Sequence, residues 1–244
     1  PYYKKKQLIK RTVLSVLKQS HKLFEIIIIY DDSDVSDLNY IKKIKKLDRR
    51  IKLIVNKKNV GAGFSRNLGI KKSSGDYIAF LDADDYWKKN KLEKQLNFML
   101  RNKYLISHTS YEIQNTSNKK LGSRFAKNYY NFEKLLVSCD IGLSSVMIKK
   151  GVLKGKLIFP NIKTKEDFVL WLLILKKGIS IYALKSKLVF WTKTENSLSS
   201  STIQKLKDSY LVYSRYMKFN VFKTLMYIFI LSFNYIKKSF LKFN

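Results

Sequence analysis

The residues that could do chemistry in this chain are acidic side chains gathered in three short clusters. In chain order these are Asp31-Asp32, Asp82-Ala83-Asp84-Asp85 and Glu166-Asp167. Carboxylate oxygens are the ligands that Mg²⁺ and Mn²⁺ prefer. A carboxylate can also take the proton of a reacting hydroxyl group. The clusters therefore indicate a divalent-metal site, a general base, or both.

The sharpest of these clusters is Asp82-Ala83-Asp84. Two carboxylates at the end of a strand could hold a cation that neutralises a diphosphate and makes it a better leaving group. Taken alone, such a pattern is more often a solvated turn or a helix cap. The apolar run 77–81 before it, the third acid Asp85 and the following Trp87 favour the metal site.

The elements that must position these acids alternate between strand and helix. We expect strands at 24–30, 51–55 and 77–81 and helices at 7–19, 38–47 and through 65–68. Such alternation predicts an open α/β fold with a mostly parallel sheet flanked by helices. Ligands bind at the carboxyl ends of the strands in these sheets. The first two acidic clusters both lie at that edge.

The second half of the chain continues the mixed pattern. We expect strands at 105–113, 144–148 and 181–189, helices at 92–100, 132–139 and 168–175, and a late loop at 193–201. Asp167 lies just ahead of an apolar helix, so it is either a first-turn acid or a catalytic base. The neighbouring Glu166 and the following Trp171 favour the base.

The domain organisation is predicted as one catalytic domain, 1–205, followed by a helical tail, 206–244. The longest apolar run of the tail, 225–233, is shorter than the ~20 residues that span a bilayer. The tail could lie in a membrane interface, anchored by its lysines, or pack onto the domain. Its basic flanks favour an anionic membrane surface.

The charge of the chain is strongly positive, since 49 Lys and Arg against 18 Asp and Glu give a formal net charge of +31. Such a field attracts anionic partners. The lysines are scattered and accompany no familiar nucleic-acid-binding module, so we expect no nucleic-acid partner. The single cysteine, Cys139, cannot form an intramolecular disulfide, which favours a reducing, cytoplasmic setting.

Taken together and in order, several segments resemble family 2 glycosyltransferases, enzymes of GT-A fold. The likeness covers about residues 1–200. Its segments are Pro1-Tyr2-Tyr3, the helix 9–19, the strand and acidic loop 24–33, Asn59-Val60-Gly61, Ser65-Arg66-Asn67-Leu68-Gly69, 80–85 and Glu166-Asp167. The order of these segments is far more specific than any one motif.

The resemblance assigns roles position by position. It implies that Asp32, with Asp31 beside it, contacts the base, that Asp82 faces the ribose or sugar phosphate, and that Asp84 ligates Mg²⁺ or Mn²⁺. Asp167 is then the general base. The remaining members of the implied donor site are Pro1, Tyr3, Asn59, Arg66, Asn67, Ala83 and Glu166.

The implied reaction is an inverting transfer from a UDP-, GDP- or dTDP-linked sugar to a glycan or lipid-linked acceptor. It would serve surface polysaccharide or lipopolysaccharide synthesis at the cytoplasmic face of the membrane. The alternatives are a nucleotidyltransferase, for which 2–5 supplies no glycine-rich loop, and a degenerate sugar- or membrane-binding module.

Two departures from the family pattern carry expectations of their own. The first strand of the family, which normally precedes Pro1, is not seen, which predicts a nucleotide pocket without a central strand. The late loop at 191–197 lacks the usual Arg and His, and Lys193 is the substitute candidate for the diphosphate contact.

Overall fold

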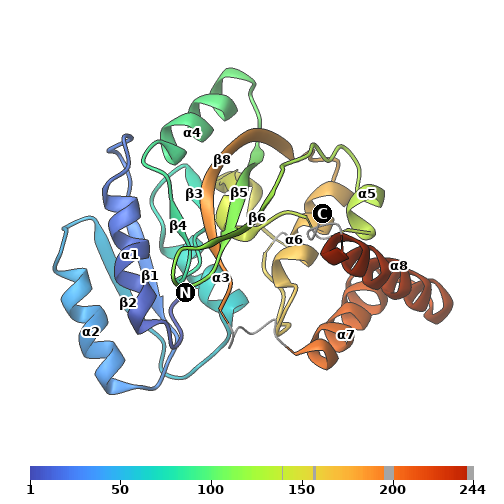
Figure 1. Ribbon diagram of the computed structural model, residues 1–244, viewed down its shortest axis with the longest axis horizontal. Coiled ribbons are helices and arrows are strands. Elements are labelled where there is room, and N and C mark those ends of the chain that lie inside the picture. The colour runs from blue at the N-terminus through green and yellow to red at the C-terminus, as the bar shows by residue number, and fades with distance from the viewer. Residues whose placement is uncertain (139, 156–157, 195–200, 241–244) are drawn as a thin grey trace.

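A computed structural model describes residues 1–138, 140–155, 158–194 and 201–240 (Figure 1). Its helices are α1 Lys6–Leu17, α2 Val35–Lys45, α3 Ala62–Lys72, α4 Lys91–Arg101, α5 Glu133–Leu136, α6 Glu166–Lys176, α7 Thr202–Leu211 and α8 Val221–Phe240. Its strands are β1 Ile26–Tyr30, β2 Ile51–Val55, β3 Tyr77–Ala79, β4 Tyr86–Trp87, β5 Ile106–Gln114, β6 Lys120–Arg124, β7 Met147–Lys149 and β8 Tyr182–Thr192.

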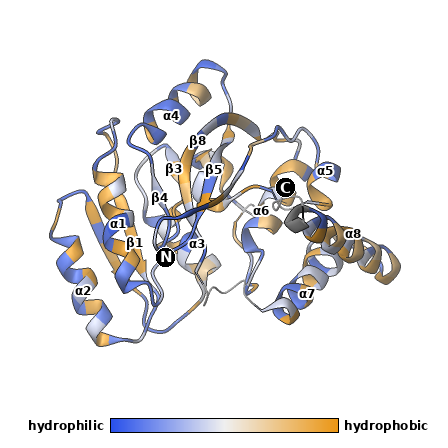
Figure 2. Cartoon of the chain, in the orientation of Figure 1, coloured by the Kyte–Doolittle hydropathy of each residue, from blue (hydrophilic) through white to orange (hydrophobic). Residues whose placement is uncertain are grey.

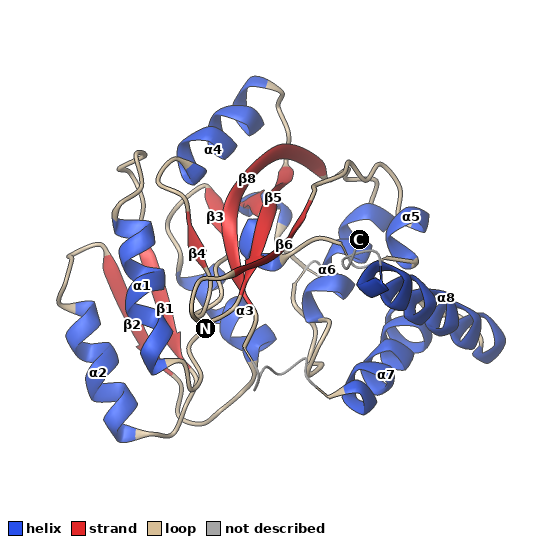
Figure 3. Cartoon of the chain, viewed as in Figure 1, coloured by secondary structure: helices blue, strands red, loops and turns tan. Residues whose placement is uncertain are grey.

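The strands form two sheets (Figure 3). One is the parallel pair β1–β2, and the other has the order β3-β7-β5-β8-β4, with β6 paired to β5. In the larger sheet β5 and β8 are parallel. Its other pairs are antiparallel. The predicted α/β class is confirmed, but the expected mostly parallel sheet is wrong, because the described strands form a mixed one.

The direction of pairing is set by contacts between the two halves of the chain. β3 pairs with β7 and β4 pairs with β8, so each strand of the first half in this sheet takes an antiparallel partner from the second half. Local alternation of strand and helix predicts only how neighbours in sequence connect. It carries no signal for pairings between strands about 70 or 100 residues apart.

An apolar cavity of about 550 Å³ lies between β1 and β3. Its walls include the side chains of 26–29 from β1 and 77–81 from the β3 segment, together with residues of α1 and α4. Pro1 and Arg66 also line it. The smaller sheet has its own core, to which α1 and α2 contribute Ile9, Val13 and Ile41, and Ile9 and Val13 also line the cavity.

The largest core surrounds α6. Residues 168–172 of this helix are fully buried, which follows from their uninterrupted apolar sequence. The tail helices join the same core through Tyr213 and Leu231. The side-chain amide of Asn234 donates to the carbonyl oxygen of Val137 at 2.9 Å. One face of α8 is therefore packed against the rest of the chain.

The opposite face of α8 is exposed and apolar. Figure 2 shows hydrophobic residues over much of the length of this helix. The exposed large side chains are Phe222, Leu225, Met226, Phe229, Phe233 and Ile236, at the three- and four-residue spacing of one helical face. Across the described residues, no helix is both long enough and apolar enough to cross a membrane.

Candidate active site

The centre of the site is the buried guanidinium group of Arg66. Its Nη2 donates to Asp82 Oδ1 at 2.8 Å, and its Nη1 pairs with Glu166 Oε1. Burial opposes the charged form of Arg66, but the two carboxylates outweigh this and raise its pKa above the usual value. Arg66 thus joins the acidic loop after β3 to the first turn of α6, across 100 residues of sequence.

The first turn of α3 brings Arg66 into this position. Gly61 begins the helix with φ of 88°, a conformation that favours glycine. A Cβ atom on Gly63 would stand 2.8 Å from the carbonyl oxygen of Pro160, so only glycine allows this close approach. Asn67 then bonds Phe159 twice, donating to its carbonyl oxygen at 2.8 Å and accepting from its N–H at 3.0 Å.

Asp31 holds the loop that leads into α3. Its Oδ1 accepts from Asn56 Nδ2 and from the N–H of Val60, both at 2.8 Å, and its Oδ2 accepts from the N–H of Gly61 at 2.9 Å. The side chain of Asn59 donates to the carbonyl oxygen of Asp31 at 2.7 Å. The carboxylate of Asp31 is therefore used to shape the loop at the end of β1.

Asp32 ties down the first residues of the chain. Its Oδ2 accepts from the N–H of Lys4 at 3.0 Å, and its Oδ1 accepts from the N–H of Ser33 at 2.8 Å. Nearby, Tyr3 remains 39% exposed. The Lys4 ammonium lies 5.3 Å from the centre of its ring.

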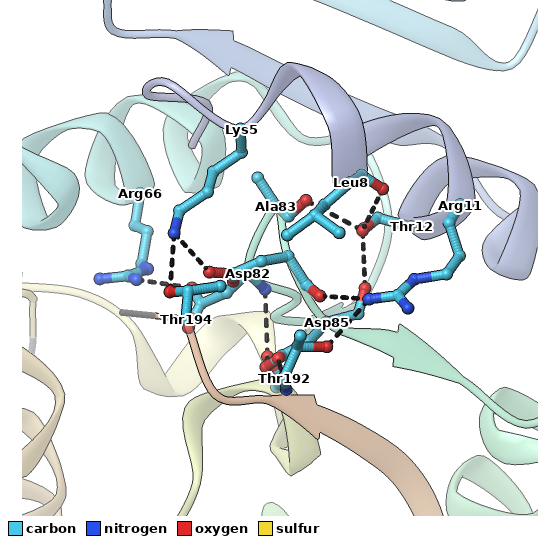
Figure 4. A network of polar contacts seen from close by, with 12 residues as sticks. Lys5, Leu8, Arg11, Thr12, Arg66, Asp82, Ala83, Asp85, Thr192 and Thr194 are labelled. Carbon is cyan, nitrogen blue, oxygen red and sulfur yellow. Dashed lines mark hydrogen bonds and ion pairs between the residues drawn. The ribbon is translucent and has the colours of Figure 1, made fainter. Parts of the chain in front are cut away.

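The loop after β3 is fixed by neighbours from α1 and β8 (Figure 4). The hydroxyl of Thr12 donates to the carbonyl oxygens of Ala83 at 3.0 Å and Asp85 at 2.7 Å. Asp85 Oδ2 accepts from Ser144 Oγ at 2.5 Å, and its Oδ1 accepts from the N–H of Thr192 at 2.8 Å. The buried side chain of Asp85 thus fixes the position of the loop that carries Asp82 and Asp84.

Asp84 pairs with a cation of the protein itself. Lys5 Nζ lies 2.9 Å from Asp84 Oδ2 and also donates to Thr194 Oγ1 at 3.0 Å (Figure 4). Burial, followed by the charge of Asp82, raises the pKa of Asp84. Arg11 Nη2 donates to the Asp84 carbonyl oxygen at 3.0 Å.

Asp167 is half-buried beside the Arg66 pair. Burial, and then the negative charge of Glu166, raises the pKa of Asp167 to about 7, while Arg66 acts in the opposite direction. Its Oδ1 accepts from the N–H of Phe168 at 2.7 Å. A carboxyl group with a pKa near neutrality is suited to exchange protons in a reaction.

The acidic residues fit a divalent cation that is held partly by substrate. Within the described ranges, no three His, Cys, Asp or Glu residues form a metal cage. Mg²⁺, however, commonly binds through one or two carboxylates together with the phosphates of its substrate. The ammonium group paired with Asp84 shows that this carboxylate faces a position where a cation is accommodated.

The structure brings together five of the twelve site residues that the sequence predicted. Arg66, Asp82, Asp84, Glu166 and Asp167 come close through the contacts above. Asn67 bonds Phe159 instead of the acids. Cys139 and residues 195–200 of the late loop lie outside the described residues. Lys193 is exposed, and its N–H donates to the carbonyl oxygen of Gln114.

Sequence reasoning missed four residues that shape the acidic loop. They are Lys5, Arg11, Thr12 and Ser144. The lysine run at 4–6 was visible at the start of the first helix. Only the packing of α1 against the loop at 82–85 shows that one of these lysines pairs with Asp84.

Comparisons with known proteins identify the family of the chain. The family model described as Glycosyl transferase family 2 matches residues 1–154. The chain is 36% identical, over 87% of its length and 84% of the relative's, to TuaG of Bacillus subtilis (strain 168), a glycosyltransferase named for teichuronic acid biosynthesis. It is 37% identical, over 85% of its length and 80% of the relative's, to the Escherichia coli UDP-Glc:alpha-D-GlcNAc-diphosphoundecaprenol beta-1,3-glucosyltransferase WfgD.

Solved structures share the fold. Staphylococcus aureus TarS 1–349 in complex with UDP-GlcNAc superposes with a TM-score of 0.70 at 21% identity, over 95% of this chain and 68% of that one. The mannosyltransferase PcManGT of Pyrobaculum calidifontis in complex with GDP-Man and Mn²⁺ superposes with a TM-score of 0.67 at 10% identity, over 95% of this chain and 70% of that one. The expected GT-A fold is thereby confirmed. With the family model covering more than half of its residues, the chain belongs to glycosyl transferase family 2.

Proposed function

We propose that this glycosyltransferase transfers a sugar, with inversion, from a nucleoside-diphosphate sugar to a lipid-linked glycan acceptor of surface polysaccharide synthesis. The observation that carries the proposal is the ion-paired bridge from Asp82 through Arg66 to Glu166. This bridge brings Asp82, the acid proposed to face the donor, close to Glu166 and its neighbour Asp167. The pKa of Asp167 is raised to about 7.

The reaction that this arrangement supports is a single displacement. The acceptor hydroxyl attacks the anomeric carbon from the face opposite the diphosphate, and Asp167 takes the hydroxyl proton. A bond forms between the acceptor oxygen and the anomeric carbon. The bond between that carbon and the diphosphate oxygen breaks, and the nucleoside diphosphate leaves with the electron pair.

Asp84 is the proposed ligand of a divalent cation, Mg²⁺ or Mn²⁺. Such a cation, when bound, stabilises the negative charge that develops on the leaving diphosphate. Asp82, held by Arg66 at 2.8 Å, is then positioned to face the ribose or the sugar phosphate. Support for a nucleotide donor comes from WfgD, which is named for UDP-Glc, and from the UDP-GlcNAc complex of TarS. The structure of PcManGT is a complex with GDP-Man and Mn²⁺.

The donor site is tested by calorimetric titration of UDP and GDP into the protein with Mn²⁺ present. We expect one nucleotide to bind, and Asp84→Asn to weaken that binding at least about tenfold, as loss of metal-site residues typically does. The matched control is Asp34→Asn, an acid-to-amide change at the exposed cap of α2. Equal binding by both variants would remove Asp84 from the metal site.

The products separate this proposal from its alternatives. Free UDP or GDP from a nucleotide sugar identifies a transferase. Pyrophosphate would identify a nucleotidyltransferase. Neither product, with sugar or lipid binding retained, would favour a degenerate binding module.

The proposed location is peripheral, at the cytoplasmic face of an anionic membrane. Apolar residues are exposed on α7 as well as on α8, and Ile203 and Leu206 of α7 are 69% and 45% exposed. Lys218, Lys223 and Lys237 lie along the same segment. An apolar helical face with basic neighbours binds to the interface of anionic lipid.

We expect the triple variant Phe222→Ser, Phe229→Ser, Phe233→Ser to lower sedimentation with anionic liposomes at least about tenfold, because it removes the largest exposed apolar side chains. Deletion of the tail is a poorer test, since Leu231 and Tyr227 pack into the core. The control changes Leu23, Leu47 and Phe125, exposed apolar residues elsewhere, to serine. An equal loss in both triple variants, or none in either, would contradict a lipid-binding face on α8.

A further inference from the structure

The ammonium group of Lys5 lies where a cation at Asp84 would be expected. Lys5 Nζ is 2.9 Å from Asp84 Oδ2 and 3.0 Å from Thr194 Oγ1. Figure 4 shows the side chain of Lys5 reaching toward Thr194 and the acidic loop. The two side chains of the ion pair are 22% and 17% exposed, so the pair is reached from solvent at the rim of the site.

The backbone of Lys5 is fixed, whereas its ammonium group is held only through a flexible side chain at the rim of the site. Its carbonyl oxygen accepts from the N–H groups of Leu8 and Ile9, both at 3.0 Å, at the start of α1. Lysine carries a compact ammonium on a flexible four-carbon stem, in contrast to the rigid guanidinium of arginine. Arg66, by comparison, is buried and held by two carboxylates, Asp82 and Glu166. Of these two cations, Lys5 is the one that a ligand can displace.

The charges around Asp84 favour displacement of Lys5 by a metal together with a diphosphate over displacement of Lys5 by a metal alone. A divalent cation that arrives alone meets the positive charges of Lys5 and Arg66 and must break the Lys5–Asp84 pair. A cation accompanied by a nucleoside diphosphate brings compensating negative charge. The ammonium released from Asp84 then has a phosphate oxygen as its new partner.

We propose that Lys5 is an internal counter-ion of Asp84 that makes metal binding depend on the nucleotide. In the free enzyme it occupies the cation position and keeps the affinity for the metal low. When the metal binds with the diphosphate, Lys5 leaves Asp84 and pairs with the diphosphate. This inference rests on the proposed role of Asp84 as a metal ligand and makes Lys5 a residue that binds the donor diphosphate.

The test is titration of Mn²⁺ alone, followed by the paramagnetic resonance signal of the free ion, with no nucleotide present. We expect Lys5→Met to bind Mn²⁺ about tenfold more tightly than the wild type, the effect on a carboxylate of removing one adjacent opposite charge. Lys6→Met is the matched control, because Lys6 lies one residue away but pairs with Asp37, at 3.1 Å. It should change the Mn²⁺ affinity less than twofold.

Further variants locate the effect. Lys5→Arg keeps the charge and should bind Mn²⁺ as weakly as the wild type, and Asp84→Asn in the Lys5→Met background should remove the gain. Repeating the titration with saturating UDP or GDP should raise the Mn²⁺ affinity of the wild type more than that of Lys5→Met. Thermal melting confirms that each variant is folded.

The outcomes separate this inference from the proposed function. If the wild type binds Mn²⁺ with a nucleotide but Lys5→Met gains no more than Lys6→Met, Lys5 is not the counter-ion and Asp84 remains the ligand. If the wild type binds no Mn²⁺ even with UDP or GDP, the proposed metal site fails and the role of Lys5 fails with it.

Discussion

Asp167→Asn is expected to lower kcat by about a thousandfold while leaving the affinity for the nucleotide within about twofold. The amide has the shape of the carboxylate, and its oxygen can still accept from the N–H of Phe168. It cannot take the proton of the acceptor hydroxyl. The loss therefore falls on the transfer step and not on donor binding.

The measurement is release of the nucleoside diphosphate from its sugar, with GlcNAc-diphosphoundecaprenol as the first acceptor to try, because WfgD is named for it. Slow hydrolysis of the donor by water gives a second readout that needs no glycan acceptor. Asp34→Asn serves again as the matched control. A variant that keeps more than about a tenth of the wild-type rate would show that another group takes the proton.

The pH dependence gives an independent check on the same residue. A general base works in its deprotonated form, and the pKa of Asp167 is raised to about 7 by burial and by Glu166. We therefore expect kcat/KM to rise with pH through about 7 and to level above it. In the Asp167→Asn variant, this rise of kcat/KM with pH should disappear.

The raised pKa of Asp167 affects stability in the opposite direction from activity as the pH rises. A stability measurement can therefore distinguish loss of the base from unfolding. The pKa of Asp167 is higher in the folded state than its usual 3.8, so the folded protein binds the proton more tightly than the unfolded chain. The contribution of protonated Asp167 to stability is full below about pH 4 and is lost as the pH rises through about 7. At pH 8 the Asp167→Asn protein is accordingly expected to be at least as stable as the wild type.

The acidic clusters could be predicted from sequence because two of them follow a strongly patterned strand and the third, Glu166-Asp167, begins a strongly apolar helix. The β-branched run before Asp31 is β1, and Asp82 follows the short strand β3. The sequence predicted that these two strand ends meet at one edge of a single sheet, whereas β1 and β3 belong to different sheets. No such pattern links Lys5 to Asp84, since the pair depends on how α1 packs against a loop about 80 residues away.

Weak or exposed elements were missed for a different reason. β6 has a polar sequence and is held mainly by its pairing with β5. α7 overlaps the start of the predicted helical tail at 206 but begins at Thr202, where Ser201 caps it by accepting from the N–H of Gln204. The role of Asp31 was also hidden, because three of its partners, Asn56, Val60 and Gly61, come from the following loop.

Arg66→Met is expected to lower the free energy of unfolding by about 3–5 kcal/mol at pH 8. The substitution keeps an unbranched side chain of similar length but removes the cation between Asp82 and Glu166. Glu166 is buried, with 8% of its surface exposed, so its charge would lose its partner where water cannot replace it. Urea unfolding of the purified protein measures the change.

Two further proteins show whether the loss comes from the buried charges. Arg50→Met removes a guanidinium that pairs with Asp48 at the surface, and it should cost only a small fraction as much. Adding Glu166→Gln to Arg66→Met should recover part of the stability, because the double variant no longer buries that unpaired carboxylate. Equal losses for Arg66→Met and Arg50→Met would contradict a buried bridge. Arg66 also lowers the pKa of Asp167. Removal of Arg66 should therefore move the rise of kcat/KM with pH to higher pH values. The same side chain thus affects both the stability of the site and the protonation of its base.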